Sequence, residues 1–206
     1  MARKSKEDAE KTRARILASA LVQFAKKGYD HTTFTDISAR LKMTKGAVYW
    51  HFKSKEALLL ALIDEMSAAF KNRIAALMPV GELTYPSVVE MMVRHAELIS
   101  KNPRGTAFFL LMHEQIRWSD ASMASVREEL LTGDRFGPWR AFKNAVERDV
   151  ASGRVRKGTV PENIALVSVA VWDGIVHAHI SGFERGPIGP ILRTAYTAMW
   201  DAIRTK

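Results

Sequence analysis

The residues best equipped for chemistry lie close together, between Thr44 and Phe52. Lys45 can donate hydrogen bonds to guanine O6 and N7, and Gly46 has no side chain, so the backbone there can come close to base edges. Nearby hydroxyl, imidazole and ammonium groups can hold phosphates without reading sequence. These groups belong to Thr33, Thr44, Tyr49, His51 and Lys55. The combination predicts a surface that binds a nucleic acid duplex.

The aromatic residues of this segment allow two interpretations, DNA contact or packing in a small core. Val48 and Phe52 have the inward phase on a helix, so we expect them in the core. Tyr49 has the outward phase, and we expect it to contact DNA. Trp50 fits both interpretations equally well.

Helical patterns surround these residues and must position them. A first helix over residues 5–27 is predicted by three-to-four spacing of apolar residues, a Ser5–Asp8 capping pattern and the stop signal Gly28. Thr33 can cap a short second helix, and Thr44 a third over about residues 45–51. Two short helices across a tight turn form a helix-turn-helix, whose second helix enters the major groove.

The rest of the chain also shows helical periods and no convincing strand pattern. A long helix is expected from Ser54 to about Met78, and further helices are expected over residues 84–101, 104–118, 122–152, 161–180 and 188–204, between breaks rich in Pro and Gly. The expected fold is all-α, with a three-helix N-terminal domain over residues 1–54 and a larger helical domain over residues 55–206.

Charge is concentrated in the N-terminal domain. Of the net charge of +9, residues 1–56 contribute +7, from 13 Lys and Arg against 6 Asp and Glu. A basic surplus confined to one segment is what binding to a phosphate backbone requires, although a solvated basic face would look the same.

The composition also excludes several classes of protein. The chain has no cysteine, which excludes disulfides and thiolate metal sites. Its charged first fifteen residues do not form a signal peptide, and apolar stretches such as residues 165–172 are shorter than the roughly 20 residues that span a membrane. We therefore expect a soluble, cytoplasmic protein.

The stretch from Arg15 to Leu59 resembles the DNA-binding domain of the TetR family of bacterial repressors. The match comprises Ile16, Leu17, Ala20, Phe24, Gly28, Thr32, Thr33 and Ile37, and then the run from Lys45 to Leu58. The resemblance implies a homodimer with two DNA-binding heads, an effector pocket and a dimer interface in residues 55–206, and release of DNA when the effector binds. The Tyr49-Trp50-His51-Phe52 form is similar to the AcrR-type regulators of multidrug efflux pumps.

Given that family, Met, His and aromatic side chains of the second domain are candidates for the pocket, because they adapt to flat apolar ligands. Each alone is as readily explained by core packing. Trp118 or Trp139 could also hold a cationic drug by cation–π attraction. The candidates are Phe70, Met92, His95, Phe109, Met112, His113, Trp118, Trp139 and Trp172. They favour a small hydrophobic or aromatic effector.

The last two predicted helices carry apolar stripes suited to a dimer interface. The candidates are Val167, Val171, Ile175, Ile191, Ala195 and Met199. Small residues such as Ala165, Ser168 and Ala198 would let helices of two subunits approach closely, although packing within one chain is the alternative. A symmetric dimer predicts a palindromic operator, because it places two recognition helices on successive major grooves.

An enzyme is not expected. The chain has no Gly-rich phosphate loop, and the His113-Glu114 pair lacks the second histidine of a zinc protease helix. His177 and His179 would point about 200° apart on a helix, which makes shared metal binding improbable. No catalytic residue, metal or cofactor is therefore predicted. The function expected is a ligand-responsive repressor of a multidrug efflux or related gene. The alternatives are a regulator of metabolic genes, a DNA binder without sequence preference and a helical protein-interaction module.

Overall fold

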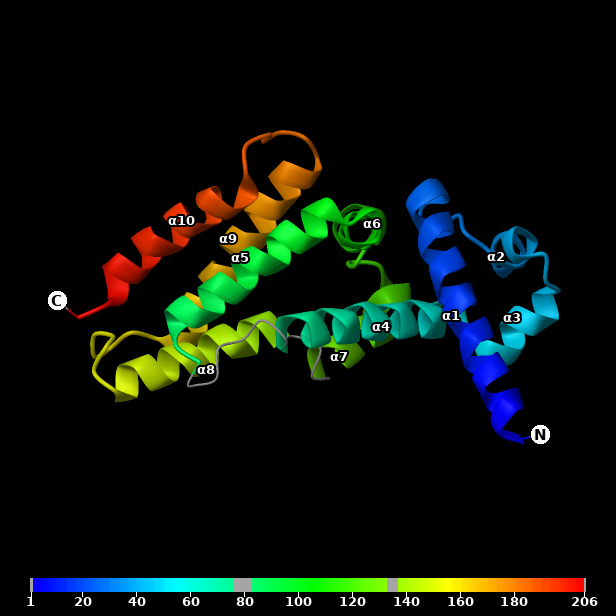
Figure 1. Cartoon of the computed structure of the whole chain (residues 1–206), viewed down its shortest axis with the longest axis horizontal. Helices are drawn as coiled ribbons and strands as arrows, with labels where there is room; N and C mark the ends of the chain where they lie inside the picture. Colours follow the sequence, from blue (N-terminus) through cyan, green and yellow to red (C-terminus); the bar gives the residue numbers. More distant parts are fainter. Residues whose placement is uncertain (1, 76–82, 133–136, 206) are drawn as a thin grey trace. The chain divides into compact units, whose positions relative to one another are not determined.

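The computed structural model describes residues 2–75, 83–132 and 137–205, and this part of the chain is helical (Figure 1). Among the described residues, β-type backbone pairing is limited to an isolated antiparallel bridge between Val155 and Arg204. The all-α expectation is confirmed.

The helices pack into two compact units. The N-terminal unit consists of Met1–Ala69 and Arg104–Thr132, and the C-terminal unit of Phe70–Pro103 and Gly133–Lys206. Packing therefore divides the chain differently from the expected boundary between residues 54 and 55, because residues 55–69 and 104–132 pack with the first three helices. The predicted boundary separates a DNA-binding domain from an effector-binding and dimerisation domain, and as a division of function it stays a prediction.

The N-terminal unit contains two groups of helices. The first group is α1 (Ala2–Lys27), α2 (Phe34–Leu41), α3 (Lys45–His51) and the first part of α4 (Lys55–Ala75). The second group is α6 (Pro103–Leu110), the π-helical turn η1 (Leu111–Gln115), η2 (Ala121–Met123) and α7 (Ala124–Thr132). The apolar faces of both groups form one core. It includes Ile16, Leu17, Ala20, Phe24, Ile37, Val48, Phe52, Leu58, Leu62, Leu111 and Ile116.

Two predicted boundaries were wrong. Ser5 does not cap α1, which begins at Ala2. The helix predicted over residues 104–118 becomes π-helical after Leu110 and ends at Gln115. The stretch predicted as helical over residues 122–152, with a break at Gly133 and Gly137-Pro138, contains α7 and α8 (Gly137–Ala151), and residues 133–136 between them lie outside the described residues. Pro138 sits at the start of α8, where a missing backbone N–H costs no hydrogen bond.

The C-terminal unit consists of α5 (Tyr85–Lys101), α8, α9 (Pro161–Ile180) and α10 (Ile188–Ile203). The fully buried Tyr85 lies at the centre of an aromatic cluster. Its ring centroid is 5.5 Å from that of Phe142, 6.5 Å from that of Tyr196 and 5.6 Å from that of Trp200, on which it stacks. This cluster joins α5, α8 and α10.

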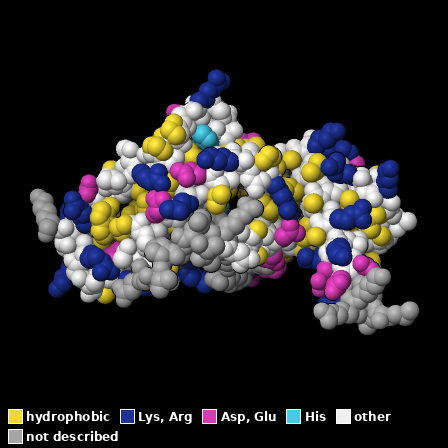
Figure 2. Space-filling model, in the orientation of Figure 1, with side chains coloured by type: hydrophobic (Ala, Val, Ile, Leu, Met, Phe, Trp, Pro, Cys, Tyr) yellow, Lys and Arg dark blue, Asp and Glu magenta, His cyan; other side chains and the backbone are white. Residues whose placement is uncertain are grey.

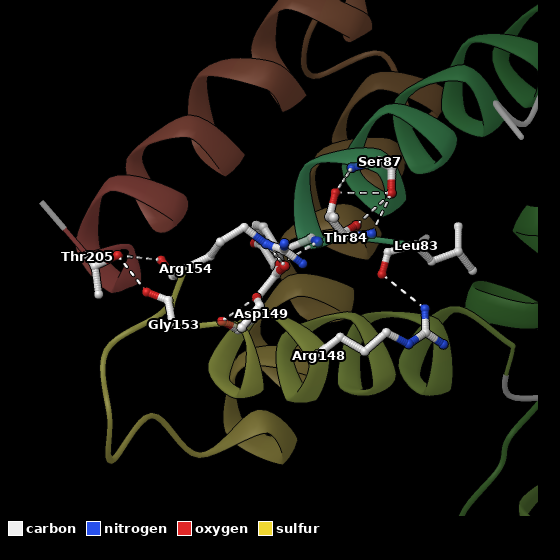
Figure 3. A network of polar contacts seen from close by, with 10 residues as sticks. Leu83, Thr84, Ser87, Arg148, Asp149, Gly153, Arg154 and Thr205 are labelled. Atoms are coloured by element: carbon white, nitrogen blue, oxygen red, sulfur yellow. Dashed lines mark hydrogen bonds and ion pairs between the residues drawn. The ribbon is translucent and has the colours of Figure 1, made fainter. Parts of the chain in front are cut away.

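Asp149 lies in a polar network that joins three segments of the C-terminal unit (Figure 3). Its fully buried carboxylate accepts hydrogen bonds from the backbone N–H of Tyr85 (2.8 Å) and from Nε of Arg154 (2.7 Å). The Thr205 hydroxyl in turn donates to the Gly153 carbonyl at 2.9 Å. The start of α5 and the loop after α8 are therefore held at one buried charge, and the C-terminal segment is attached to that loop.

The α9 helix has one buried apolar face and one exposed apolar face. Ala165, Ser168, Trp172 and Val176 are buried, whereas Leu166 and Val167 are 62% and 48% exposed. By length and composition alone, α9 is apolar enough to cross a membrane, which the sequence did not lead us to expect. The expectation that Ala165 and Ser168 lie at a dimer interface was wrong, because both pack inside the chain.

Candidate nucleic-acid interface

The start of α2 is fixed by a capping box between Thr33 and Asp36. The backbone N–H of Asp36 donates to the Thr33 hydroxyl (3.2 Å), and the backbone N–H and hydroxyl of Thr33 donate to the Asp36 carboxylate (2.8 and 2.7 Å). The Lys27 ammonium pairs with the same carboxylate. Hydrogen bonds from Lys27 and then from Thr33 hold the pKa of Asp36 well below its usual range. The predicted phosphate donor Thr33 thus also has a structural role.

The turn between α2 and α3 is closed by backbone hydrogen bonds. Lys42 adopts the left-handed conformation (φ 54°), and the N–H of Met43 donates to the Ser38 carbonyl at 3.0 Å. Thr44 then caps α3, since its hydroxyl oxygen accepts from the N–H of Ala47 at 3.2 Å. Both predicted caps are confirmed.

The α3 helix presents two faces of opposite character. Val48 is fully buried, and Phe52, the C-cap residue of α3, is 4% exposed, as predicted. Lys45, Gly46, Tyr49 and Trp50 are exposed. Trp50 is 68% exposed, so it is not a core residue. The inward side chains fix the helix and leave the predicted base-facing and phosphate-facing residues in solvent.

Nothing within the described chain requires glycine at position 46. Its φ lies outside the left-handed range, and a Cβ added there would meet only the Thr44 hydroxyl oxygen, at 3.9 Å. Glycine weakens a helix by roughly 0.5–1 kcal/mol relative to alanine. Packing within the described chain therefore does not explain the glycine, and an approach of DNA to the backbone at Gly46 stays a prediction.

The side chain of Tyr49 is held in place although it is 44% exposed. Its ring makes an edge contact with the buried Phe34 of α2, at 4.8 Å between centroids. The ammonium of Lys45 lies 5.6 Å from the centroid of the Tyr49 ring. The first turn of α3 therefore presents a cation whose position is set by an aromatic ring, and α2 supports that ring.

His51 lies at the C-terminal end of α3 and is partly buried. Its imidazole makes an edge contact with the Trp50 indole at 4.6 Å. Burial lowers the pKa of His51 below its usual 6.5, and the positive charge of Arg13 lowers it further. The imidazole of the free protein is therefore mainly neutral near pH 7.

Lys55, a predicted phosphate contact, is directed to the chain itself. Its ammonium donates to the backbone carbonyls of Tyr29 (2.9 Å) and Asp30 (3.1 Å) and lies 4.4 Å from the centroid of the Tyr29 ring. Lys55 thereby fastens the start of α4 to the loop between α1 and α2. Its contact with DNA remains a proposal.

Sequence reasoning missed Arg13, which the fold brings beside α3. Its guanidinium carbon lies 5.2 Å from the centroid of the Phe52 ring. The two residues are far apart in sequence, so no local pattern links them, although Arg13 continues the inward phase of Ile16, Leu17 and Ala20 on α1. Lys and Arg side chains are spread over the visible face of α1–α3 (Figure 2).

The predicted pocket residues divide between the two units. In the C-terminal unit, the His95 ring stacks on Trp172 at 5.0 Å, and Nε1 of Trp172 donates to the Met92 carbonyl at 2.9 Å. Burial lowers the pKa of His95 to about 3. Trp139 lies in the same unit, with the Lys143 ammonium 5.8 Å from its ring centroid.

Four further candidates, Phe109, Met112, His113 and Trp118, lie in the N-terminal unit. Phe109 and His113 stack at 4.1 Å, and Nε1 of Trp118 donates to the Met112 carbonyl at 2.7 Å. Phe70 belongs to α4, but its side chain lies outside the described residues. The structure thus brings four of the candidates together as two ring pairs, His95 with Trp172 and Phe109 with His113.

Within the described ranges, no group of three or more His, Cys, Asp or Glu side chains is placed to hold a metal ion.

The chain is similar to known bacterial regulators. Residues 16–62 match the model of the family "Bacterial regulatory proteins, tetR family". The chain is 27% identical over 182 residues to the probable acrEF/envCD operon repressor of Escherichia coli (strain K12), covering 84% of this chain and 76% of that protein.

Solved structures share the fold. SmeT in complex with triclosan superimposes with a TM-score of 0.78 at 24% identity, over 95% of this chain and 92% of that one. SmeT is the repressor of the Stenotrophomonas maltophilia multidrug efflux pump SmeDEF. FadR from Bacillus subtilis in complex with stearoyl-CoA gives a TM-score of 0.75 at 16% identity, over 89% and 95% of the chains.

These proteins are transcriptional regulators, not enzymes. The matched residues 16–62 contain α2, α3 and the first turns of α4, whose outward side chains form the candidate interface. Over residues 16–62 the chain matches the tetR family of bacterial regulatory proteins, and over most of its length it is similar to regulators such as the acrEF/envCD operon repressor and SmeT.

Proposed function

We propose that this protein is a cytoplasmic, ligand-responsive transcriptional repressor. It binds a palindromic operator as a homodimer and is released by a small hydrophobic or aromatic effector. The genes under its control encode a multidrug efflux system or a related function. The probable acrEF/envCD operon repressor and SmeT support this choice of genes by similarity.

The observation that carries the proposal is the outward face of α3. Lys45, Gly46, Tyr49 and Trp50 are exposed together on a helix that Val48 and Phe52 anchor in the core. Gly46 brings the backbone close to base edges, Lys45 donates to a guanine, and Tyr49 contacts the sugar-phosphate backbone. In addition, Thr44, Trp50 and His51 from α3 and Thr33 and Lys55 from the adjoining helices belong to this interface.

The exposed face of α9 supports the homodimer. Only 22% of its apolar stretch is buried within one chain, and Leu166 and Val167 lie on the open side. Gly174 shares that side, and an added Cβ would meet nothing within 4 Å. A mid-helix glycine in open space permits close approach of a helix from a second copy. Leu166, Ala170 and Gly174 therefore join the predicted set of Val167, Val171, Ile175, Ile191, Ala195 and Met199.

The stacked His95–Trp172 pair supports an apolar or aromatic effector. Because burial keeps His95 uncharged near neutral pH, the stacked pair presents aromatic surface without a charge. Such a surface suits a neutral aromatic molecule, and SmeT has been solved in complex with triclosan. A regulator of metabolic genes is the alternative, which FadR bound to stearoyl-CoA favours through its fold.

Selection from a random duplex library tests the central claim. We expect the full-length protein to enrich a palindrome and to bind it at least 1,000-fold more tightly than random DNA of equal length. Lys45→Ala should relax the preference at one base pair of each half-site. Equal affinity for all duplexes would instead establish binding without sequence preference.

Two further measurements separate the remaining parts of the proposal. Light scattering should give twice the chain mass for the wild type and one chain mass for Leu166→Glu, because a buried unpaired charge disfavours the interface. Triclosan and stearoyl-CoA, titrated separately into the protein–operator complex, distinguish an aromatic effector from an acyl-CoA. A monomeric wild type would contradict the dimer.

A further inference from the structure

Several cations of the N-terminal unit are paired with carboxylates. Lys27 pairs with Asp36, Arg104 with Glu65, and Arg117 with Asp30 at 2.9 Å. Two other cations flank α3 and lie over aromatic rings instead, Lys45 over Tyr49 and Arg13 over Phe52. A ring positions a cation without neutralising it, so the charge stays available to an anion.

Arg13 is directed towards α3 by the phase of α1. Ile16, Leu17 and Ala20 form the buried stripe of this helix, and Arg13 continues it one turn closer to the N-terminus. There its guanidinium carbon lies 5.2 Å from the centroid of the Phe52 ring, and Phe52 is itself 4% exposed. A rigid core residue therefore sets the position of the charge.

Arg13 and His51 both lie near the ring of Phe52. The ring centroids of His51 and Phe52 are 6.4 Å apart, and the guanidinium carbon of Arg13 lies 5.2 Å from the Phe52 centroid. The positive charge of Arg13 also contributes, after burial, to the lowered pKa of His51. Among the described residues, no carboxylate forms an ion pair with Arg13. An exposed guanidinium and a partly buried imidazole thus lie near the same core ring. A phosphate would satisfy both, because Arg offers paired N–H donors and a protonated imidazole adds another.

The location of His51 at the C-terminal end of α3 supports the binding of a phosphate there. A helix C-terminus carries partial negative charge, which repels phosphate. The seven residues of α3 span about 10 Å, so when its first turn enters a major groove about 12 Å wide, its other end comes near the backbone. A cation supplied by another helix offsets the repulsion at that end.

We propose that Arg13 and His51 form a phosphate-binding site at the C-terminal end of α3, which holds the DNA backbone. The inference rests on the proposed entry of α3 into the major groove. It adds a contact from α1, outside the helix-turn-helix, that carries affinity and not sequence preference.

The test compares Arg13→Ala with Arg15→Ala in the full-length protein. Both arginines are exposed on α1, but two residues apart they point about 200° apart, so Arg15 faces away from α3. For Arg13→Ala we expect about tenfold weaker binding to selected and random duplexes alike. The slope of log affinity against log salt should shrink by about 0.9 for each subunit bound. Arg15→Ala should leave that slope unchanged.

A scan of single methylphosphonate substitutions along the selected duplex locates the contact. One position in each half-site should weaken the wild type and leave Arg13→Ala unaffected, and Arg13→Lys should restore part of the salt slope. Each phosphonate profile compares duplexes bound by the same protein. A lower stability of Arg13→Ala therefore does not affect the comparison. Equal salt slopes for Arg13→Ala and Arg15→Ala, or identical phosphonate profiles for wild type and Arg13→Ala, would overturn the inference. Loss of sequence preference in the wild type would refute the proposed function but leave the Arg13 test on random DNA intact.

Discussion

Replacing Gly46 with alanine should change stability and DNA binding in opposite directions. The added methyl group meets only the Thr44 hydroxyl oxygen at 3.9 Å, and the backbone already has a φ that alanine accepts. Alanine should therefore stabilise α3 by roughly 0.5–1 kcal/mol. For a chain of this size, that corresponds to a rise of about 1–4 °C in the melting temperature.

The same methyl group faces the proposed path of the DNA. If it displaces α3 so that one bidentate base contact is lost, about 1–3 kcal/mol of discrimination disappears, and affinity for the selected operator falls at least about fivefold. Thermal unfolding and fluorescence anisotropy with a labelled operator measure the two effects. A Gly46→Ala protein that is more stable and binds the operator as tightly as the wild type would refute the argument that DNA approaches this backbone.

A reciprocal change on the same helix serves as the control. Ala47 is half-buried and does not share the exposed face of Gly46. Ala47→Gly should cost roughly 0.5–1 kcal/mol of stability. Operator affinity measured well below the melting temperature should change by less than about twofold, because no group on the proposed DNA face is altered. Parallel losses of affinity in both variants would point to a general effect of altering α3.

Three further predictions concern charge. Asp149→Asn should destabilise the protein by about 2–3 kcal/mol in thermal unfolding, since it breaks a buried ion pair, whereas Asp201→Asn, in an exposed pair, should cost less than about 0.5 kcal/mol. The pKa of His95 in the folded protein is about 3, below the unfolded value of 6.5. The unfolded state therefore binds the proton first, and the free energy of unfolding should fall by up to about 1.4 kcal/mol per pH unit from pH 6.5 towards 3; His95→Phe should remove this part of the slope. Phosphate favours protonated His51, so operator affinity should rise as pH falls from 8 to 6, and His51→Gln should flatten that dependence.

The order of helices followed from the sequence because its signals are local. Capping by Thr33 and Thr44 and the inward phase of Val48 and Phe52 depend on residues within one or two helical turns, and the structure confirms them. Boundaries were less certain where such signals compete. Ser5 resembles a cap, but α1 already begins at Ala2.

Residues 44–52, with Thr33 and Lys55, were identified from the sequence as the candidate interface, because residue type and spacing on one short helix are enough to place side chains on a common face. Tertiary structure decided what those side chains are free to do. Lys55 is engaged by carbonyls 25 and 26 residues earlier in the chain, and Arg13 reaches Phe52 from another helix. Such contacts join residues far apart in the chain, and they depend on how helices pack, which no local period records. For the same reason only the packed structure separated the buried face of α9 from the face that Leu166 and Gly174 leave open.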